Sequence, residues 1–122
     1  MIEFSEDKPI YSQIADYCME CVLSGTWAPG ARIPSVRELA VELAVNTRTV
    51  MKAYEILEDA GVIISRRGMG YYADEEAPEK VKTLRRRDFF AVTLPALLHE
   101  MELLGITTDD LIKHIQKNIS SI

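Results

Sequence analysis

The chain has 122 residues, 48% of them hydrophobic, and a net charge of −5, which suits one globular domain or a small domain with an appendage. No apolar run approaches the roughly 18–20 residues of a membrane span, and residues 1–7 are acidic, unlike the start of a secretory signal. We therefore expect a cytoplasmic protein without a membrane partner. The negative net charge argues against nucleic-acid binding. Residues 32–70, however, carry six basic and only five acidic side chains. A mildly basic face on an acidic body is compatible with DNA binding.

The first predicted helix opens at Pro9, because proline suits the first helical turn. Apolar side chains recur at helical spacing as far as Leu23, and Gly25 is a typical helix end. A turn containing Pro29 and Gly30 follows.

This helix contains a C-x-x-C pair, Cys18 and Cys21, which could be a redox pair or half of a zinc site. No second cysteine pair exists, and His99 and His114 lie far along the chain. Cys18 also lies at i+4 from Ile14, and buried cysteine behaves as a small hydrophobe. We therefore interpret both cysteines as core residues and expect neither a metal nor a cofactor.

A second and a third helix are predicted on either side of a tight turn at residues 44–46. Ser35 is a plausible N-cap, and Glu38 three residues later completes a capping box. Asn46 is the N-cap candidate for the third helix, which spans about residues 47–59. The inward stripe of that helix consists of Val50, Ala53, Tyr54 and Leu57. Its outward side chains are Thr47, Arg48, Met51, Lys52 and Glu55.

A β-hairpin with a basic tip is predicted next. Residues 62–65 and 71–73 are β-prone, and the basic, glycine-rich turn at 66–70 joins them. Residues 74–78 are acidic, contain a proline and resemble a linker.

The remaining residues are predicted to form a tail of two helices. Helical spacing extends over residues 79–104, with a kink or break expected at Pro95. Thr107 and Asp110 resemble a capping box for the last helix. Two helices have too little mutual surface to bury their apolar side chains, so we expect a second copy to cover them. The expected dimer contacts are Phe89, Val92, Leu97, Met101, Leu104, Leu111 and Ile115.

This order of elements is typical of a winged helix-turn-helix, in which a helix enters the major groove with its first turn against the base edges. Arg48 can bind guanine through two hydrogen bonds, and Asn46, Thr47 and Thr49 can read bases or hold phosphates. Ser35 joins the candidates because helix N-termini favour phosphate oxygens.

The wing supplies a second group of candidates. Arg66 and Arg67 can reach the DNA backbone or the minor groove, and Gly68 and Gly70 permit a close approach. Together with Lys52, these arginines are cations without a rigid setting, so we expect all three to contact the DNA backbone. The predicted fold class is mainly α with a small β-hairpin wing: a winged helix-turn-helix domain over residues 1–74 and a two-helix dimerisation tail over 75–122.

Four spaced blocks resemble the GntR family of bacterial regulators. They are P-I-Y-x-Q-I at residues 9–14, P-G-x-R-I-P-S-x-R-E-L-A at 29–40, V-N-x-x-T-V-x-x-A-Y-x-x-L-E-x-x-G at 45–61, and R-R-G-x-G at 66–70. The resemblance implies a homodimer that binds roughly palindromic operators in double-stranded DNA. It implies DNA contacts for Arg37, Arg48, Thr49 and Gly68. Met51 stands where many members have a basic residue, which leaves Lys52 as the nearest cation.

About 50 residues follow the wing (122 − 72), too few for the large ligand-binding or aminotransferase-like domains of most branches of that family. A two-helix tail resembles the YtrA-like branch, which implies a dimerisation role and control of transporter operons.

Two functions from different classes stay open. One is a DNA-binding repressor, and the other is a small-molecule sensor whose main site is a cavity in the dimer tail, lined by Phe89 and Phe90. Winged helices also serve as protein-interaction modules, and the arginines of the wing and of residues 85–87 could be solvated. No nucleophile–base pair, acidic pair or phosphate loop stands out, so we do not expect an enzyme.

Overall fold

The computed structural model describes residues 3–5 and 7–120. The chain divides into two compact units, Met1–Leu84 and Arg85–Ile122. The first unit contains α1 (Ile10–Ser24), α2 (Val36–Leu43), α3 (Thr47–Asp59), β1 (Ile63–Arg66) and β2 (Gly70–Ala73). Helix α4 (Ala77–Asp88) begins in the first unit and ends in the second, which also holds a π-helical turn (Phe89–Thr93), α5 (Leu94–Leu104) and α6 (Thr108–Ser120). The predicted fold class, mainly α with a small β-hairpin wing, is confirmed.

The helices of the first unit begin where the sequence places their caps. The Ser35 hydroxyl accepts a hydrogen bond from the backbone N–H of Glu38 at 3.1 Å, and the Glu38 carboxylate accepts one from the backbone N–H of Ser35 at 3.0 Å. The side-chain oxygen of Asn46 accepts one from the backbone N–H of Arg48 at 2.8 Å. Between α2 and α3 the chain turns at Ala44, whose φ of 56° is left-handed. The predicted capping box and the predicted start of α3 are confirmed.

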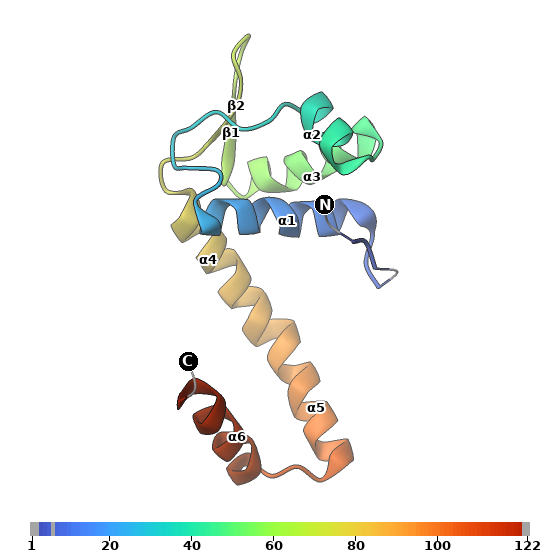
Figure 1. Cartoon of the computed structure of the whole chain (residues 1–122), viewed down its shortest axis with the longest axis vertical. Helices are drawn as coiled ribbons and strands as arrows, with labels where there is room; N and C mark the ends of the chain where they lie inside the picture. Colours follow the sequence, from blue (N-terminus) through green and yellow to red (C-terminus); the bar gives the residue numbers. More distant parts are fainter. Residues whose placement is uncertain (1–2, 6, 121–122) are drawn as a thin grey trace. The chain divides into compact units, whose positions relative to one another are not determined.

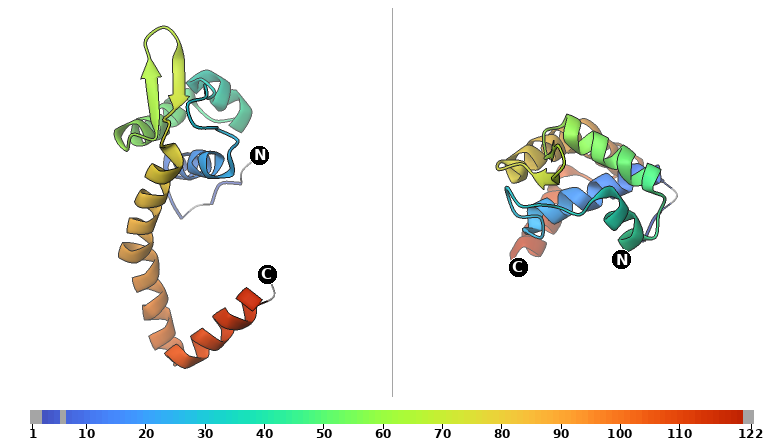
Figure 2. Two further views of the ribbon diagram at one scale, coloured as in Figure 1. Left: turned by 90° about the vertical axis from the view of Figure 1, so that its left-hand side faces the viewer. Right: turned by 90° about the horizontal axis from the view of Figure 1, so that it is seen from above.

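The core of the first unit lies between α1, α2, α3 and the hairpin. Helix α1 runs alongside α3, as Figures 1 and 2 show. All four residues of the predicted inward stripe of α3 are buried, and Cys18 and Cys21 are buried beside them. Removing these side chains from water supplies the main stabilisation of the domain, about 1.5–3 kcal/mol for each large apolar group.

The wing is an antiparallel hairpin with a third segment along one side. Strands β1 and β2 pair from Ile63 with Ala73 to Arg66 with Gly70. The segment before α2 pairs with β2 through a bridge between Arg32 and Tyr72. This segment joins the wing to the start of α2, so both are held by one hydrogen-bonded framework.

The predicted linker at residues 74–78 is wrong. Asp74 accepts a hydrogen bond from the backbone N–H of Glu76 at 2.9 Å and forms an ion pair with Lys80 at 3.1 Å. Ala77 and Val81 are fully buried in the core of the first unit. The acidic residues 74–76 therefore lead directly into the packed helix α4, and the first compact unit extends to Leu84.

Pro95 is the second residue after the π-helical turn, and the helix continues through it. Proline has no N–H, and its ring collides with the carbonyl four residues earlier in an α-helix. The wider turn, in which the N–H of Leu94 bonds the carbonyl of Phe89, accommodates the ring without ending the helix. The expected disturbance at Pro95 thus takes the form of a π-helical turn on its N-terminal side.

The second unit carries the predicted last helix and much exposed apolar surface. The chain leaves α5 through left-handed Gly105, and Thr107 and Asp110 form the reciprocal hydrogen bonds of a capping box. Within the described residues no single helix is long and apolar enough to cross a membrane. One bent pair, Ala77–Leu104 with Thr108–Ile119, meets the length and composition requirements when both helices are counted together.

Candidate nucleic-acid interface

The first turn of α3 presents polar side chains from a fixed backbone. Thr47 and Arg48 are exposed and Thr49 is half-buried, while the Asn46 cap holds the backbone N–H of Arg48. The buried face of the same helix contains Tyr54, whose hydroxyl donates to the carbonyl of Pro34 at 2.6 Å. Because Pro34 directly precedes the cap of α2, this hydrogen bond ties the start of α2 to α3.

Aromatic contacts also connect α3 to the wing. The ring of Tyr54 makes edge-to-face contacts with Tyr71 of β2, at 5.0 Å between centroids, and with Trp27, at 6.2 Å. Such pairs contribute about 0.5–1.5 kcal/mol beyond the buried area. Burial raises the pKa of the Tyr54 hydroxyl, which therefore stays protonated as a donor at neutral pH. The Tyr54 side chain thus contacts the start of α2, Trp27 and the wing, and it helps to fix their placement relative to α3.

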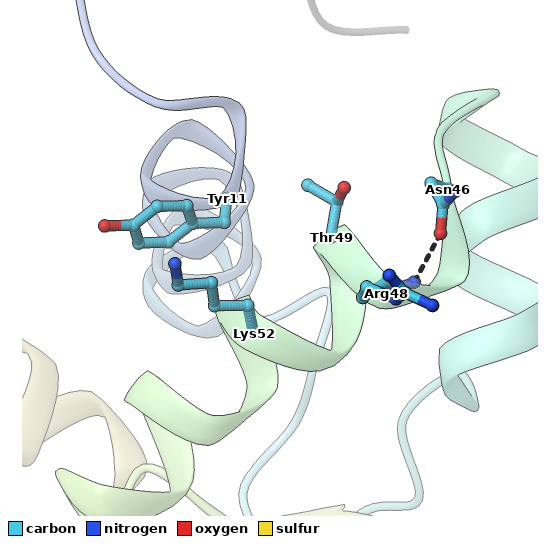
Figure 3. A pocket seen from close by; sticks show the side chains of 5 residues that line it. All are labelled: Tyr11, Asn46, Arg48, Thr49 and Lys52. Carbon is cyan, nitrogen blue, oxygen red and sulfur yellow. Dashed lines mark hydrogen bonds between the residues drawn. The ribbon is translucent and has the colours of Figure 1, made fainter.

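A shallow, open hollow of about 330 Å³ lies beside the first turn of α3. Four of its lining residues, Asn46, Arg48, Thr49 and Lys52, were predicted as DNA contacts. The fifth is Tyr11 from the first turn of α1, which the sequence analysis did not select as a site residue. Figure 3 shows all five side chains around the hollow.

Lys52 has a defined setting, contrary to the sequence-based expectation. Its ammonium nitrogen lies 4.2 Å from the centroid of the Tyr11 ring, the geometry of a cation–π contact. The two residues lie far apart in the sequence and on different helices. Only the packing of α1 against α3 brings them together.

The start of α2 offers two further candidates. Ser35 uses its hydroxyl oxygen in the capping box, and Arg37 is exposed in the first turn. The backbone N–H and the hydroxyl of Ser35 hydrogen-bond the Glu38 carboxylate and lower its pKa. Glu38 therefore stays ionised, which suits the positive end of the helix dipole.

The wing carries Arg66, Arg67, Gly68 and Gly70 away from the helical layer, as the left view of Figure 2 shows for the hairpin. Arg66 also has a rigid setting, because its guanidinium carbon lies 4.5 Å from the centroid of the Tyr72 ring. Arg67 and Gly68 are exposed at the turn.

Sequence reasoning missed Arg32 as a neighbour of the wing. Gly70 has a φ of +97°, and a Cβ at that position would lie 3.3 Å from the Nε of Arg32. The exposed Arg32 side chain therefore lies against the backbone of the wing. The signal available in the sequence was the basic residue three positions before Ser35, but only the pairing of residue 32 with β2 places it there.

The residues expected to form the dimer contact differ in exposure. Phe89, Val92, Leu97, Leu104 and Ile115 are 40–66% exposed. Leu111 is half-buried, and Met101 is the buried side chain among the described residues of the second unit. Phe89 and Phe90 contact each other edge to face at 5.3 Å and both remain exposed.

The cysteine pair belongs to the core, as the helical spacing indicates. Cys18 is fully buried and Cys21 is 8% exposed, and burial raises the pKa of both thiols. Within residues 3–5 and 7–120, no group of three or more His, Cys, Asp or Glu side chains is arranged to hold a metal ion.

Residues 10–72 match the family model described as bacterial regulatory proteins, gntR family. The chain belongs to the GntR family. It is 32% identical over 116 residues to the uncharacterized HTH-type transcriptional regulator YhcF of Bacillus subtilis, covering 93% of each chain. It is 48% identical over 69 residues to the HTH-type transcriptional repressor YtrA of the same organism, covering 57% of this chain and 53% of YtrA.

Solved structures agree with this assignment. A GntR family transcriptional regulator from Listeria monocytogenes has a TM-score of 0.78 and 35% identity, over 93% of this chain and 98% of that one. The AraR DNA-binding domain in complex with operator ORX1 has a TM-score of 0.53 and 27% identity, over 60% of this chain and 89% of that one. This chain is therefore a DNA-binding transcription regulator with a winged-helix fold and YtrA-like relatives.

Proposed function

We propose that this regulator is a repressor that binds a roughly palindromic operator as a homodimer. The observation that carries the proposal is the capped, exposed first turn of α3, which presents Thr47 and Arg48 beside a hollow containing Lys52. Such a helix start fits the major groove and can read base edges there. The similarity of the winged domain to a domain bound to its operator supports this use of the surface.

The proposed contacts divide into base readout and backbone binding. Arg48 reads a base, because an exposed arginine in the first helical turn can bind guanine with two hydrogen bonds. Arg37, Lys52, Arg66 and Arg67 bind phosphates. The proposed interface is completed by Ser35, Asn46, Thr47, Thr49 and the wing glycines Gly68 and Gly70.

The proposed dimer forms through the second unit. Its exposed apolar side chains need a cover, and two-fold pairing is the commonest arrangement of soluble oligomers. A two-fold dimer sets two recognition helices about one DNA turn apart, roughly 34 Å, or a multiple of that. Met101 is already buried within one chain, so the exposed side chains of the second unit supply most of this contact.

We also propose that the protein represses transcription and that it controls an operon for a transporter. They follow from the YtrA-like tail and from a relative that is itself named a repressor. A protein that acts on bacterial chromosomal DNA works in the cytoplasm. A small-molecule effector is compatible with the exposed pair Phe89 and Phe90, but no observation favours a sensor as a separate function.

Selection of binding sites from random duplexes with the full chain tests the proposal. We expect enrichment of an inverted repeat with half-site centres about one helical turn apart or a multiple of it. We also expect that adding the protein lowers transcription in vitro from a promoter carrying the enriched sequence. If no sequence is enriched, the chain does not bind DNA sequence-specifically. If a sequence is enriched but the protein increases transcription, only the proposed role as a repressor is contradicted.

A further inference from the structure

Tyr11 brings a residue of α1 into the surface formed by α3. It lies in the first turn of α1, is half-buried, and lines the same hollow as Asn46, Arg48 and Thr49. In Figure 3 its ring extends over the end of the Lys52 side chain, and the measured separation is 4.2 Å from the ammonium nitrogen to the ring centroid.

The ring changes what Lys52 can do. A lysine ammonium sits on a flexible four-carbon stem, and fixing such a side chain on binding costs conformational entropy. The face of an aromatic ring attracts the cation without neutralising it. None of the ion pairs formed by the described residues involves Lys52, so its full charge is presented to the open hollow.

We propose that Tyr11 is a positioning residue for DNA binding. Its ring holds the Lys52 ammonium beside the first turn of α3, where a phosphate of the DNA backbone is bound. This inference rests on the proposed use of α3 in the major groove, and it adds α1 to the elements that determine affinity. The ring acts through Lys52, so its effect depends on the presence of that lysine.

A double-mutant cycle on the full chain tests this dependence. The variants are Tyr11→Leu, Tyr11→Phe, Lys52→Gln and the combination of Tyr11→Leu with Lys52→Gln. Tyr17→Leu, alone and combined with Lys52→Gln, is the matched control, because Tyr17 is another half-buried tyrosine of α1 and lines a different hollow. Dissociation constants are measured by fluorescence anisotropy at several salt concentrations. The probes are the duplex enriched by the wild-type chain and a scrambled duplex of equal length.

We expect Tyr11→Leu to weaken binding to both duplexes by about two- to fivefold, the equivalent of one exposed cation–π contact. Tyr11→Phe keeps the ring and should bind like the wild type. Lys52→Gln should lower the salt slope by about one. In the Lys52→Gln background, Tyr11→Leu should cause no further loss, whereas Tyr17→Leu should have the same effect in both backgrounds.

Three results would overturn the positioning role. They are unchanged binding by Tyr11→Leu, equal losses from Tyr11→Leu with and without Lys52, and a loss from Tyr11→Phe as large as that from Tyr11→Leu. A general effect on folding would appear as equal losses in both backgrounds, so poor folding does not imitate the expected result. If the wild-type chain enriches no sequence, the proposed function fails together with the inference. If it does enrich one, only the inference is at stake.

Discussion

Arg48 and Lys52 lie one turn apart on α3 and differ in their surroundings. Lys52 is held against the Tyr11 ring, whereas the Arg48 side chain is exposed in the first turn. A planar guanidinium forms two directed hydrogen bonds with guanine, while an ammonium acts as a compact point charge. The two cations are therefore suited to different parts of DNA, a base edge for Arg48 and a phosphate for Lys52.

Replacement of Arg48 by alanine should relax the preference at one base pair of each half-site. The loss of a bidentate contact should cost about 1–3 kcal/mol on the preferred sequence and much less on a scrambled duplex. Site selection with Arg48→Ala measures the first effect, and Lys52→Gln is the control, because it should weaken all sequences alike. An unaltered consensus with Arg48→Ala would eliminate its role in base reading.

Both cysteine thiols should resist alkylation in the native protein. Thiolate is the reactive form, and burial raises the pKa of Cys18 and Cys21, so little thiolate exists at pH 8. We expect labelling by iodoacetamide only at the rate at which the domain opens, with full labelling in denaturant as the control. Rapid labelling of the folded protein would show that the pair is accessible and not a core element.

At the residue scale, the sequence predicts the location of a side chain where that location depends only on its own helix. The places of Arg48 and Thr49 in the first turn of α3 follow from the Asn46 cap and from the periodicity of that helix. Tyr11 could not be selected, because its contact with Lys52 depends on how two helices pack. Arg32 was missed for the same reason, since its neighbour Gly70 belongs to a strand far along the chain.

At the scale of elements, the capping box of α2 should contribute to stability in a pH-dependent way. Hydrogen bonds from Ser35 lower the pKa of Glu38 below its unfolded value of about 4.3. The contribution is therefore fully present above about pH 4.3 and is lost as the pH falls through the folded pKa. Urea unfolding of the wild type and Glu38→Gln should differ at pH 7 and converge in acid. If the difference in the free energy of unfolding between the two proteins is the same at all pH values, the charge of Glu38 does not contribute to the stability of the capping box.

Ser35→Ala supplies the complementary measurement. Loss of a serine N-cap typically costs about 1 kcal/mol, and it also removes the hydroxyl that lowers the pKa of Glu38.

The elements themselves were largely predictable, and the exceptions have identifiable causes. Helix α3 spans the predicted residues 47–59, because Asn46 caps its start and Gly61 follows its end. The sequence predicts helical spacing only from residue 79, whereas α4 begins at Ala77. The difference arises because the acidic residues after β2 resemble a linker. In the structure Asp74 binds Lys80, and Ala77 packs in the core. The π-helical turn before Pro95 has no sequence signature other than the proline itself.

At the scale of the whole molecule, the proposed dimer should be sensitive to charge on the second unit. Val92 is 66% exposed in the single chain, so Val92→Lys should leave the monomer fold intact. Burying an unpaired ammonium in a dimer contact is costly. Sedimentation should therefore show a shift toward monomer, and His99→Lys, at an exposed polar position of α5, is the control. A fully dimeric Val92→Lys protein would place the contact elsewhere.

A change in half-site spacing tests whether the chain binds a palindromic site as a dimer. The duplex enriched by the wild-type chain is compared with the same duplex after insertion of five base pairs at its centre. Half a turn of DNA places one half-site on the opposite face, so a two-fold dimer can no longer bind both. We predict two chains per intact duplex and a loss of affinity of about tenfold or more after the insertion. Equal affinity for both duplexes, or one chain on the intact duplex, would contradict binding as a two-fold dimer.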